Sequence, residues 1–474
     1  MKRLLLLLNF IILQNVSAQN PFVEVPPQDK PTTLIIPKGL HYKVLFSEGD
    51  SVYTSDGKIG KAKGWHDMVL TIPDKNNSSI KLAVSHECND SSTVLGDGGG
   101  MSIIPLRLTN EEWAVNGKIL NIDFTTVGGT YDNCSGTLVE GKNTILSAEE
   151  GTPDSNDKLQ KKGKGYRDVS DFNNLPRYKH TGWMVEVDPN TNKAIHKLYS
   201  MGRFVHESAL VMPDGKTVFL TDDYAPCIFF KFVSDTKNDF TKGQLYAYKE
   251  STVKDTSHWI KLPMQLDSLV QIRNVALRMG ATYFLRMEWM TLVNNKIYIT
   301  ETGYDGFLEE KLYDGKAAKH LKSFSLKPGL IDHPYGSILE FDLATNDIRV
   351  LLDGGAGKTK HFANPDAITN VTIKGKTYLI ISEDIFNSNR GRASEAALND
   401  KSVVNEIYWL DLSIKDPTVE DLKRFVIAPL GSETTGGAFI KNDSKYYFFN
   451  VQHPDSSNPP PFNKSCTVVI DLGK

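Results

Sequence analysis

The sequence predicts an all-β protein built as a β-propeller. Short runs of apolar, β-branched and aromatic residues recur from Leu40 onward, and turns rich in Gly, Asp and Asn separate them. Groups of strands return at intervals of about 50–70 residues, which is typical of blades around a central channel. Six blades are the expected number; seven blades and a pair of Greek-key sandwiches are the alternatives.

The strands predicted along the chain share one form, a run of four to eight apolar residues bounded by turn residues. Several form hairpins, as in the run before Pro213-Asp214-Gly215-Lys216 and the run after it. In order, the predicted strands cover 41–46, 68–72, 80–85, 144–148, 182–188, 209–212, 218–221, 229–233, 244–248, 290–293, 297–300, 337–342, 378–382, 406–411 and 446–451.

The N-terminal segment differs from the rest of the chain. Lys2 and Arg3 precede a short apolar run, and small residues follow at Val16, Ser17 and Ala18. This pattern predicts a secretory signal peptide over 1–18, cleaved near Ala18, and therefore a secreted or periplasmic protein.

The remaining chain is expected to form one domain. Residues 19–39 are rich in proline and predict an extended lead-in, and 40–474 predict a single propeller domain. Long polar stretches at 151–180, 251–285 and 302–335 are expected to be loops that cap one face.

Composition excludes some classes of partner. The 474 residues carry a net charge of −3, which gives no sign of a nucleic-acid partner. No stretch after the signal approaches the ~20 apolar residues of a membrane-spanning helix. A monomer is expected. The pairing of the four cysteines, Cys88, Cys134, Cys227 and Cys466, is left open by their spacing.

Acidic residues recur where the predicted strands end. In a propeller these strand ends converge on the channel mouth, where crowded carboxylates need protons or cations to neutralise them. Calcium, which takes many oxygen ligands, suits such a site. The alternative for each acid is a solvated turn residue. The acids in question are Glu87, Glu149, Glu150, Asp222, Asp223, Glu301, Glu383 and Asp384.

Cys134 adds a different kind of ligand. It lies in the glycine-flanked stretch 129–137, shortly before Glu149 and Glu150. A soft thiolate beside hard carboxylates suits iron better than calcium alone. The alternative is a small, inert, buried cysteine.

Two further segments predict chemistry. His206-Glu207 precedes small residues, and Arg286 and Glu288 stand two residues apart, so that they point to the same side of a strand. A carboxylate there could hold a metal while the guanidinium grips a phosphate or carboxylate in bidentate fashion. An ordinary ion pair is the alternative.

Taken together, the ordered motifs resemble the PhoX family of alkaline phosphatases over about Val84 to Pro454. The segments that carry the resemblance are Asp132-Asn133-Cys134-Ser135-Gly136, Ala148-Glu149-Glu150, Gly182-Trp183-Met184-Val185-Glu186-Val187-Asp188-Pro189, Gly202-Arg203-Phe204-Val205-His206-Glu207, Thr221-Asp222-Asp223, Phe230-Lys231-Phe232-Val233-Ser234, Arg286-Met287-Glu288-Trp289, Asn364-Pro365-Asp366, Glu433-Thr434-Thr435-Gly436 and Asn450-Val451-Gln452-His453-Pro454.

The resemblance implies a six-bladed propeller that uses Ca2+ and Fe3+ at its channel mouth to hydrolyse phosphate monoesters outside the cytoplasm, as in phosphate acquisition. It implies that Arg286 grips the substrate phosphate and that Cys134, Glu207 and Glu288 belong to the catalytic iron site. The remaining metal ligands are expected among Asp223, Glu149, Glu150, Glu87, Glu433 and Asp366.

The chain departs from the family pattern in three places. Met287 stands where proline is usual, Ala148 where cysteine is common, and Lys2-Arg3 where a twin-arginine signal is found. None of these changes removes a predicted ligand.

Two other functions compete with the phosphatase. A calcium-dependent propeller lactonase or esterase needs only oxygen ligands and leaves Cys134 without a role. A non-catalytic propeller would use its acids for structural calcium. The sequence lacks the Gly-x-Ser-x-Gly, phosphate-loop and His-Glu-x-x-His motifs, which argues against serine hydrolases, nucleoside triphosphatases and zinc peptidases.

Overall fold

The computed structural model describes residues 21–473, except for 29, 75–77, 91, 163–174, 252–257, 310, 359 and 386–403. The predicted signal peptide, residues 1–18, lies outside the described residues. Within them, no helix combines the length and the apolar character needed to cross a membrane.

Strands dominate the described chain, and six sheets have four or more of them. We number these sheets in chain order. Sheet 1 contains β4 (His66–Pro73), β5 (Ser79–His86) and β6 (Gly100–Thr109), with β2 (Ser51–Tyr53), β3 (Ile59–Lys61), β7 (Glu112–Val115) and β8 (Leu120–Asn121). Sheet 2 contains β9 (Asn133–Val139), β10 (Thr144–Glu149), β11 (Met184–Asp188) and β12 (Lys193–Lys197). Sheet 3 contains β13 (His206–Val211), β14 (Thr217–Asp222), β16 (Phe230–Thr236), β17 (Asp239–Lys249) and β18 (His258–Lys261).

The second half of the chain builds the other three sheets. Sheet 4 contains β20 (Met287–Val293), β21 (Lys296–Glu301), β26 (Ser337–Asp342) and β27 (Ile348–Asp353); sheet 5 contains β30 (Pro365–Ile373), β31 (Lys376–Glu383), β32 (Glu406–Asp411) and β33 (Lys423–Ile427); sheet 6 contains β34 (Glu433–Ile440), β35 (Asp443–Gln452), β36 (Cys466–Asp471) and β1 (His41–Ser47).

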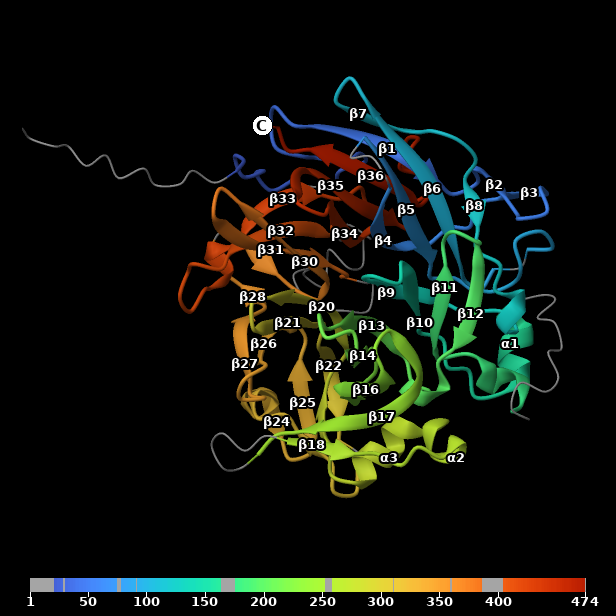
Figure 1. Cartoon of the computed structure of the whole chain (residues 1–474). Coiled ribbons are helices and arrows are strands. Elements are labelled where there is room, and N and C mark those ends of the chain that lie inside the picture. The colour runs from blue at the N-terminus through green and yellow to red at the C-terminus, as the bar shows by residue number, and fades with distance from the viewer. Residues whose placement is uncertain are drawn as a thin grey trace, which may run out of the picture.

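The first strand of each sheet, apart from the added N-terminal strands, lies at the centre of the molecule. These inner strands contact one another in a closed order, β4 to β9, β13, β20, β30, β34 and back to β4. Figure 1 shows their labels in a ring near the middle of the view, with the other strands farther out. All six sheets therefore present one strand to a common axis.

Sheet 6 joins the two ends of the described chain. β1 pairs antiparallel with β36, from His41 opposite Asp471 to Ser47 opposite Cys466. β36 in turn pairs with β35, and β35 with the inner strand β34. The N-terminal strand thus forms the outer edge of the sheet that the C-terminal strands build.

Alternate residues of a strand enter different cores, because side chains alternate between the two faces of a sheet. On β31, Leu379 and Ile381 belong to a core shared with sheets 1, 2 and 4. Tyr378 and Ile380 belong to the core between sheets 5 and 6. Both faces are buried, which explains why these strands are apolar throughout rather than alternating.

The described part of the lead-in packs on the propeller. Phe22 lies against Trp409, with ring centroids 5.2 Å apart, and Ile35 bridges to Ile427. Its apolar residues among the prolines account for this contact.

The long inserts carry more structure than the loops expected there. They hold α1 (Asn156–Lys162), α2 (Leu266–Leu269) and α3 (Ile272–Arg278), and the short strands β19 (Thr282–Phe284), β22 (Tyr304–Leu308), β23 (Lys316–Ala317), β24 (Ser325–Lys327) and β25 (Leu330–His333). Three further short strands, β15 (Cys227–Ile228), β28 (Gly355–Ala356) and β29 (His361–Phe362), lie outside these inserts. In α3, Ile272, Ala276 and Leu277 are buried, so a short amphipathic pattern was missed among polar residues.

Candidate metal centre

Five inner strands place a possible metal ligand at the same position. The second residue of each strand is an acid or a thiol: Asp67 of β4, Cys134 of β9, Glu207 of β13, Glu288 of β20 and Asp366 of β30. Because the inner strands ring one axis, these five side chains come from five different sheets toward one point.

A β-bulge lies at each of these positions. In sheet 3, His206 pairs with Asp222 and Ala209 with Leu220, so the inner strand has one extra residue in between. The same shift occurs in sheets 1, 2, 4 and 5, each time across the ligand residue. A bulge bends the strand and re-aims the side chain that it contains. The repeated bulge thus explains how successive sheets direct one residue each into the centre.

A second set of acids follows the neighbouring strands. Glu87, Glu150, Asp223 and Asp384 come directly after β5, β10, β14 and β31. Glu433, the first residue of β34, adds a carboxylate from sheet 6, and His453 Nε2 lies 3.2 Å from its Oε2. Strand starts and strand ends at this end of the hairpins therefore both contribute to the centre.

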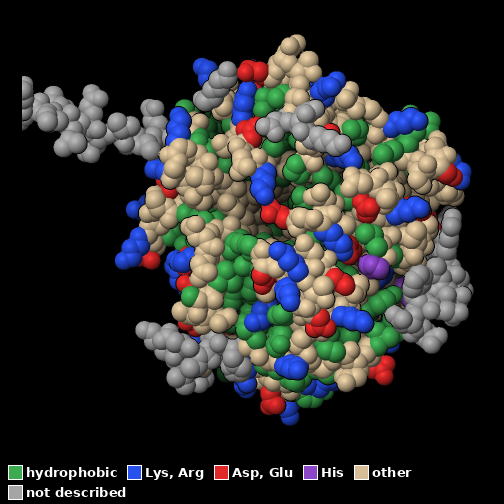
Figure 2. Space-filling model, in the orientation of Figure 1, with side chains coloured by type: hydrophobic (Ala, Val, Ile, Leu, Met, Phe, Trp, Pro, Cys, Tyr) green, Lys and Arg blue, Asp and Glu red, His purple; other side chains and the backbone are tan. Residues whose placement is uncertain are grey.

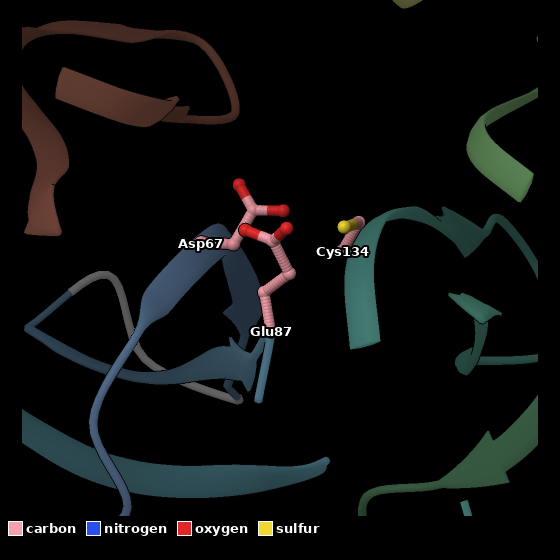
Figure 3. Close-up of side chains that lie close together, drawn as sticks. All are labelled: Asp67, Glu87 and Cys134. Atoms are coloured by element: carbon pink, nitrogen blue, oxygen red, sulfur yellow. The ribbon is translucent and has the colours of Figure 1, made fainter. Parts of the chain in front are cut away.

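Three groups of these residues bring their ligand atoms within 4.8 Å of one another: Asp67, Glu87 and Cys134; Cys134, Glu150 and Glu207; and Glu207, Glu288 and Asp366. Figure 3 shows the carboxylates of Asp67 and Glu87 and the sulfur of Cys134 pointing toward a common space. Cys134 and Glu207 each belong to two groups, so the three groups form one continuous cluster.

Burial and mutual repulsion raise the pKa of most groups in the cluster. Burial, with a contribution from Asp384, raises the pKa of Asp67 to about 7. Burial and the charge of Asp223 raise the pKa of Glu150 to about 8. Burial and neighbouring carboxylates hold the pKa of Glu207 well above its usual range. Such a site is stable when charged only if cations balance it.

Five further members show the same shift, whereas Asp223 differs because, against the effect of burial, the Arg286 guanidinium lowers its pKa. Burial first, and neighbouring carboxylates second, place the pKa values of Glu87, Glu288, Asp366, Glu433 and Cys134 well above their ordinary values.

Arg286 stands at the edge of this cluster. Its Nε lies 2.8 Å from Asp223 Oδ1, and one terminal nitrogen lies 3.0 Å from Glu288 Oε1. Its φ of 60° is uncommon for a residue other than glycine, and such backbone strain concentrates at functional sites. The Arg286 side chain is 24% exposed, against 10% for Asp223 and 4% for Glu288, so solvent reaches the cluster beside the guanidinium.

Glu149 corrects one prediction. Its carboxylate accepts hydrogen bonds from Lys197 Nζ at 2.7 and 3.0 Å, from Thr130 Oγ1 at 2.9 Å and from the Trp183 amide at 3.2 Å. These partners occupy both oxygens, and the three metal-type groups do not include Glu149. Adjacent residues of a strand point to opposite sides, so Glu150 faces the centre while Glu149 faces the interior of the sheets.

The same division recurs along the ring. Asp222 pairs with Arg273, whose Nε lies 2.7 Å away, while Asp223 joins the site. Glu301 accepts from His320 at 2.6 Å, and the next residue, Thr302, donates to Glu288 at 2.9 Å. In each pair the first residue anchors the sheet and the second faces the centre.

Asp67 is a site residue that the sequence analysis missed. The dipeptide His66-Asp67 repeats His206-Glu207 at the start of another inner strand, and this was the available signal. Both histidines are buried and structural: His66 Nε2 lies 3.1 Å from Lys63 O and His206 Nε2 lies 2.9 Å from Gly202 O. Asp384 was noticed only as a strand-end acid; among the described residues its Oδ1 is buried without a hydrogen-bond partner.

The donor set fits multivalent cations. Nine carboxylates and one thiol converge, and among the described residues Arg286 is the cation that forms ion pairs with them, apart from a histidine beside Glu433. Figure 2 shows that charges of both signs are mixed on the face turned to the viewer. All four cysteines are free and buried, so Cys134 is available as a ligand.

Comparison with known proteins identifies the family of this chain. The family model for alkaline phosphatase PhoX matches residues 112–455. The structure of Pseudomonas fluorescens PhoX in complex with vanadate, a transition-state analogue, is similar with a TM-score of 0.71 and 19% identity, covering 95% of this chain and 97% of that one. No curated protein sequence matches.

More remote likenesses are limited to general shape. A Trypanosoma rangeli sialidase in complex with 2,3-difluorosialic acid matches with a TM-score of 0.44 and 9% identity, covering 92% of this chain and 60% of that one. The strand content and the match to the Pseudomonas structure identify the fold as a β-propeller. Since the family model covers most of the sequence, the chain belongs to the PhoX family of alkaline phosphatases and is a phosphatase.

Proposed function

We propose that the protein hydrolyses phosphate monoesters at an iron and calcium cluster in the mouth of the propeller channel. The observation that carries this proposal is the continuous cluster of Asp67, Glu87, Cys134, Glu150, Glu207, Glu288 and Asp366, with Arg286 at its exposed edge. The six sheets around one axis support a count of six blades.

The ligand chemistry suggests how the ions would be distributed. The two groups that share Cys134 combine sulfur with carboxylate and suit iron. The group of Glu207, Glu288 and Asp366 offers only oxygen and suits calcium. Bound multivalent cations supply Lewis acidity, which offsets the charge of the phosphoryl group and activates water.

The protein's own groups would bind and orient the ester. The Arg286 guanidinium, held in plane by Asp223 at 2.8 and 3.0 Å, would donate to phosphate oxygen through its other terminal nitrogen. Glu288, a proposed metal ligand, also contacts Arg286, so it links the position of the guanidinium to the cluster. A lactonase would leave the thiol of Cys134 without use, and the phosphatase accounts for it.

We also propose that the protein acts outside the cytoplasm, on the basis of the predicted signal peptide. Small phosphate esters are its proposed substrates, and the monomeric state stays a prediction.

The direct test is metal analysis with a visible spectrum of the purified protein, together with hydrolysis of a chromogenic phosphate monoester before and after chelation. We expect iron and calcium, a ferric–thiolate absorption band, and loss of activity on chelation. A colourless protein that contains calcium alone would overturn the iron assignment, and activity that resists chelation would overturn the metal mechanism.

A further inference from the structure

Tyr224 is an exposed aromatic residue beside the proposed phosphate grip. It follows Asp223 directly, and its carbonyl oxygen accepts a hydrogen bond of 3.0 Å from the Arg286 amide. The residue is 47% exposed, although it adjoins a buried cluster. Because it is exposed, the Tyr224 ring is accessible to a ligand that binds at this edge of the site.

One face of this ring rests on a fixed cation. The Arg273 guanidinium lies 4.0 Å from the centroid of the Tyr224 ring. Arg273 is itself held by Asp222, which is fully buried and accepts from Nε at 2.7 Å. The backbone amide of Tyr224 also donates to Asp222 O at 2.9 Å. Asp222 thus holds both the backbone of Tyr224 and the guanidinium of Arg273. The contact between the ring and this cation further restricts the motion of the ring.

Arg286 marks the solvent-exposed edge of the cluster. Among the charged groups that contact one another at this edge, Arg286 has the most exposed side chain. A phosphate group held by Arg286 would leave the rest of the ester outside the buried cluster. The backbone hydrogen bond from the Arg286 amide to the Tyr224 carbonyl oxygen keeps the exposed Tyr224 beside this edge of the cluster.

We propose that Tyr224 is a specificity-determining residue that stacks on a flat ring in the alcohol part of the substrate. The inference rests on the proposed phosphatase function and deepens it: it assigns a preference for phosphate monoesters that carry a nucleobase or an aryl ring. Stacking on an aromatic side chain tolerates different rings, because each has a π face.

The test compares two esters of similar reactivity, adenosine 5′-monophosphate and glycerol 3-phosphate. The quantity measured is the ratio of their kcat/KM values with the metal-loaded enzyme. In Tyr224→Ala we expect this ratio to fall about tenfold, equivalent to about 1.4 kcal/mol. Tyr224→Phe, which keeps the ring, is expected to retain the wild-type ratio. Tyr224→Leu keeps bulk without a flat ring and is expected to behave as Tyr224→Ala, which provides a second variant if the alanine variant folds poorly.

Tyr313 gives a matched control. It is also exposed and lies beside an arginine, with Arg278 5.9 Å from its ring centroid, but it belongs to the segment between β22 and β23 and not to one of the strand ends that supply the cluster. Tyr313→Ala is expected to leave the ratio unchanged. An unchanged ratio in both Tyr224→Ala and Tyr224→Leu would overturn the inference while leaving the phosphatase intact. Failure of the wild-type protein to hydrolyse either ester would instead overturn the proposed function itself.

Discussion

The sulfur of Cys134 lies 3.1 Å from Oε2 of Glu150. Cys134 is the second residue of β9, and Glu150 follows the antiparallel neighbour β10, so one hairpin brings a soft and a hard ligand atom into contact. Each belongs to a group that also includes Glu207 of the next sheet. Sheet 2, through Cys134 and Glu150, and sheet 3, through Glu207, therefore contribute ligands to the same proposed metal site.

Replacing Cys134 by serine tests the sulfur ligand. We expect Cys134→Ser to lose the visible absorption band and at least about a hundredfold in kcat/KM, because the soft donor is gone. Absorption spectra, iron content and ester hydrolysis measure these losses. Cys466→Ser, which changes another buried free cysteine, is the control and is expected to keep both properties. A Cys134→Ser enzyme with normal colour and activity would refute the assignment.

Adjacent glutamates should respond in opposite ways. Glu149→Gln leaves Lys197 buried without its charged partner, which is expected to cost about 3–5 kcal/mol of unfolding free energy. Its metal content per folded molecule should be retained. Glu150→Gln removes a proposed ligand, so metal content and activity should fall without a comparable loss of stability of the metal-free form. Chemical denaturation and metal analysis of both variants decide the matter; a metal-depleted but stable Glu149→Gln protein would contradict the division of roles.

Arg286→Lys tests the phosphate grip. Lysine keeps the charge but not the planar fork, so we expect inhibition by inorganic phosphate to weaken and kcat/KM to fall about ten- to a hundredfold. Initial rates with and without phosphate measure this change. Arg349 offers a matched control, since it holds Glu340 in the same bidentate manner, at 2.8 and 3.0 Å, away from the cluster. Equal effects in Arg349→Lys would argue against a special role for Arg286.

Removing the metals should make stability depend on pH. In the metal-free protein burial and neighbouring carboxylates raise the pKa of Asp67 to about 7 and that of Glu150 to about 8, above their ordinary values of 3.8 and 4.5. The folded form then keeps protons that the unfolded chain has released, so stability is greatest below about pH 4 for these groups and falls as pH rises through about 8. The slope approaches about 1.4 kcal/mol per pH unit for each proton.

Thermal unfolding with a chelator at several pH values measures this dependence. The metal-loaded protein, in which cations balance the carboxylates, should show a flatter profile. A metal-free protein that becomes more stable between about pH 5 and 8 would show that the acids are not mutually repelling.

The sequence was sufficient for the fold class, and it singled out most of the residues that the structure brings together. Apolar runs with regular turns predicted the strands, because both faces of each sheet are buried. Cys134, Glu207 and Glu288 stand at equivalent positions of successive inner strands and lie together as expected. Helix α3 was missed because its apolar residues are few and the surrounding stretch is polar.

The choice between neighbouring acids was beyond the sequence. Which member of Glu149-Glu150 faces the centre depends on strand register, and a shift of one residue exchanges the two faces. The bulges that direct Asp67 and its counterparts inward leave no mark in composition. Asp67 would have required the recognition that His66-Asp67 and His206-Glu207 are repeats of one feature.

The pairing of β1 with β36 sets the order in which the molecule can be completed. Sheet 6 supplies Glu433 through β34. It lies against β4 of sheet 1, which carries Asp67, so both of these neighbouring sheets contribute proposed metal ligands. During synthesis the ribosome delivers β36 only after nearly all the chain has emerged, and contacts between residues so distant in sequence form slowly. We therefore expect the proposed ions to bind tightly only after sheet 6 has formed and closed the ring.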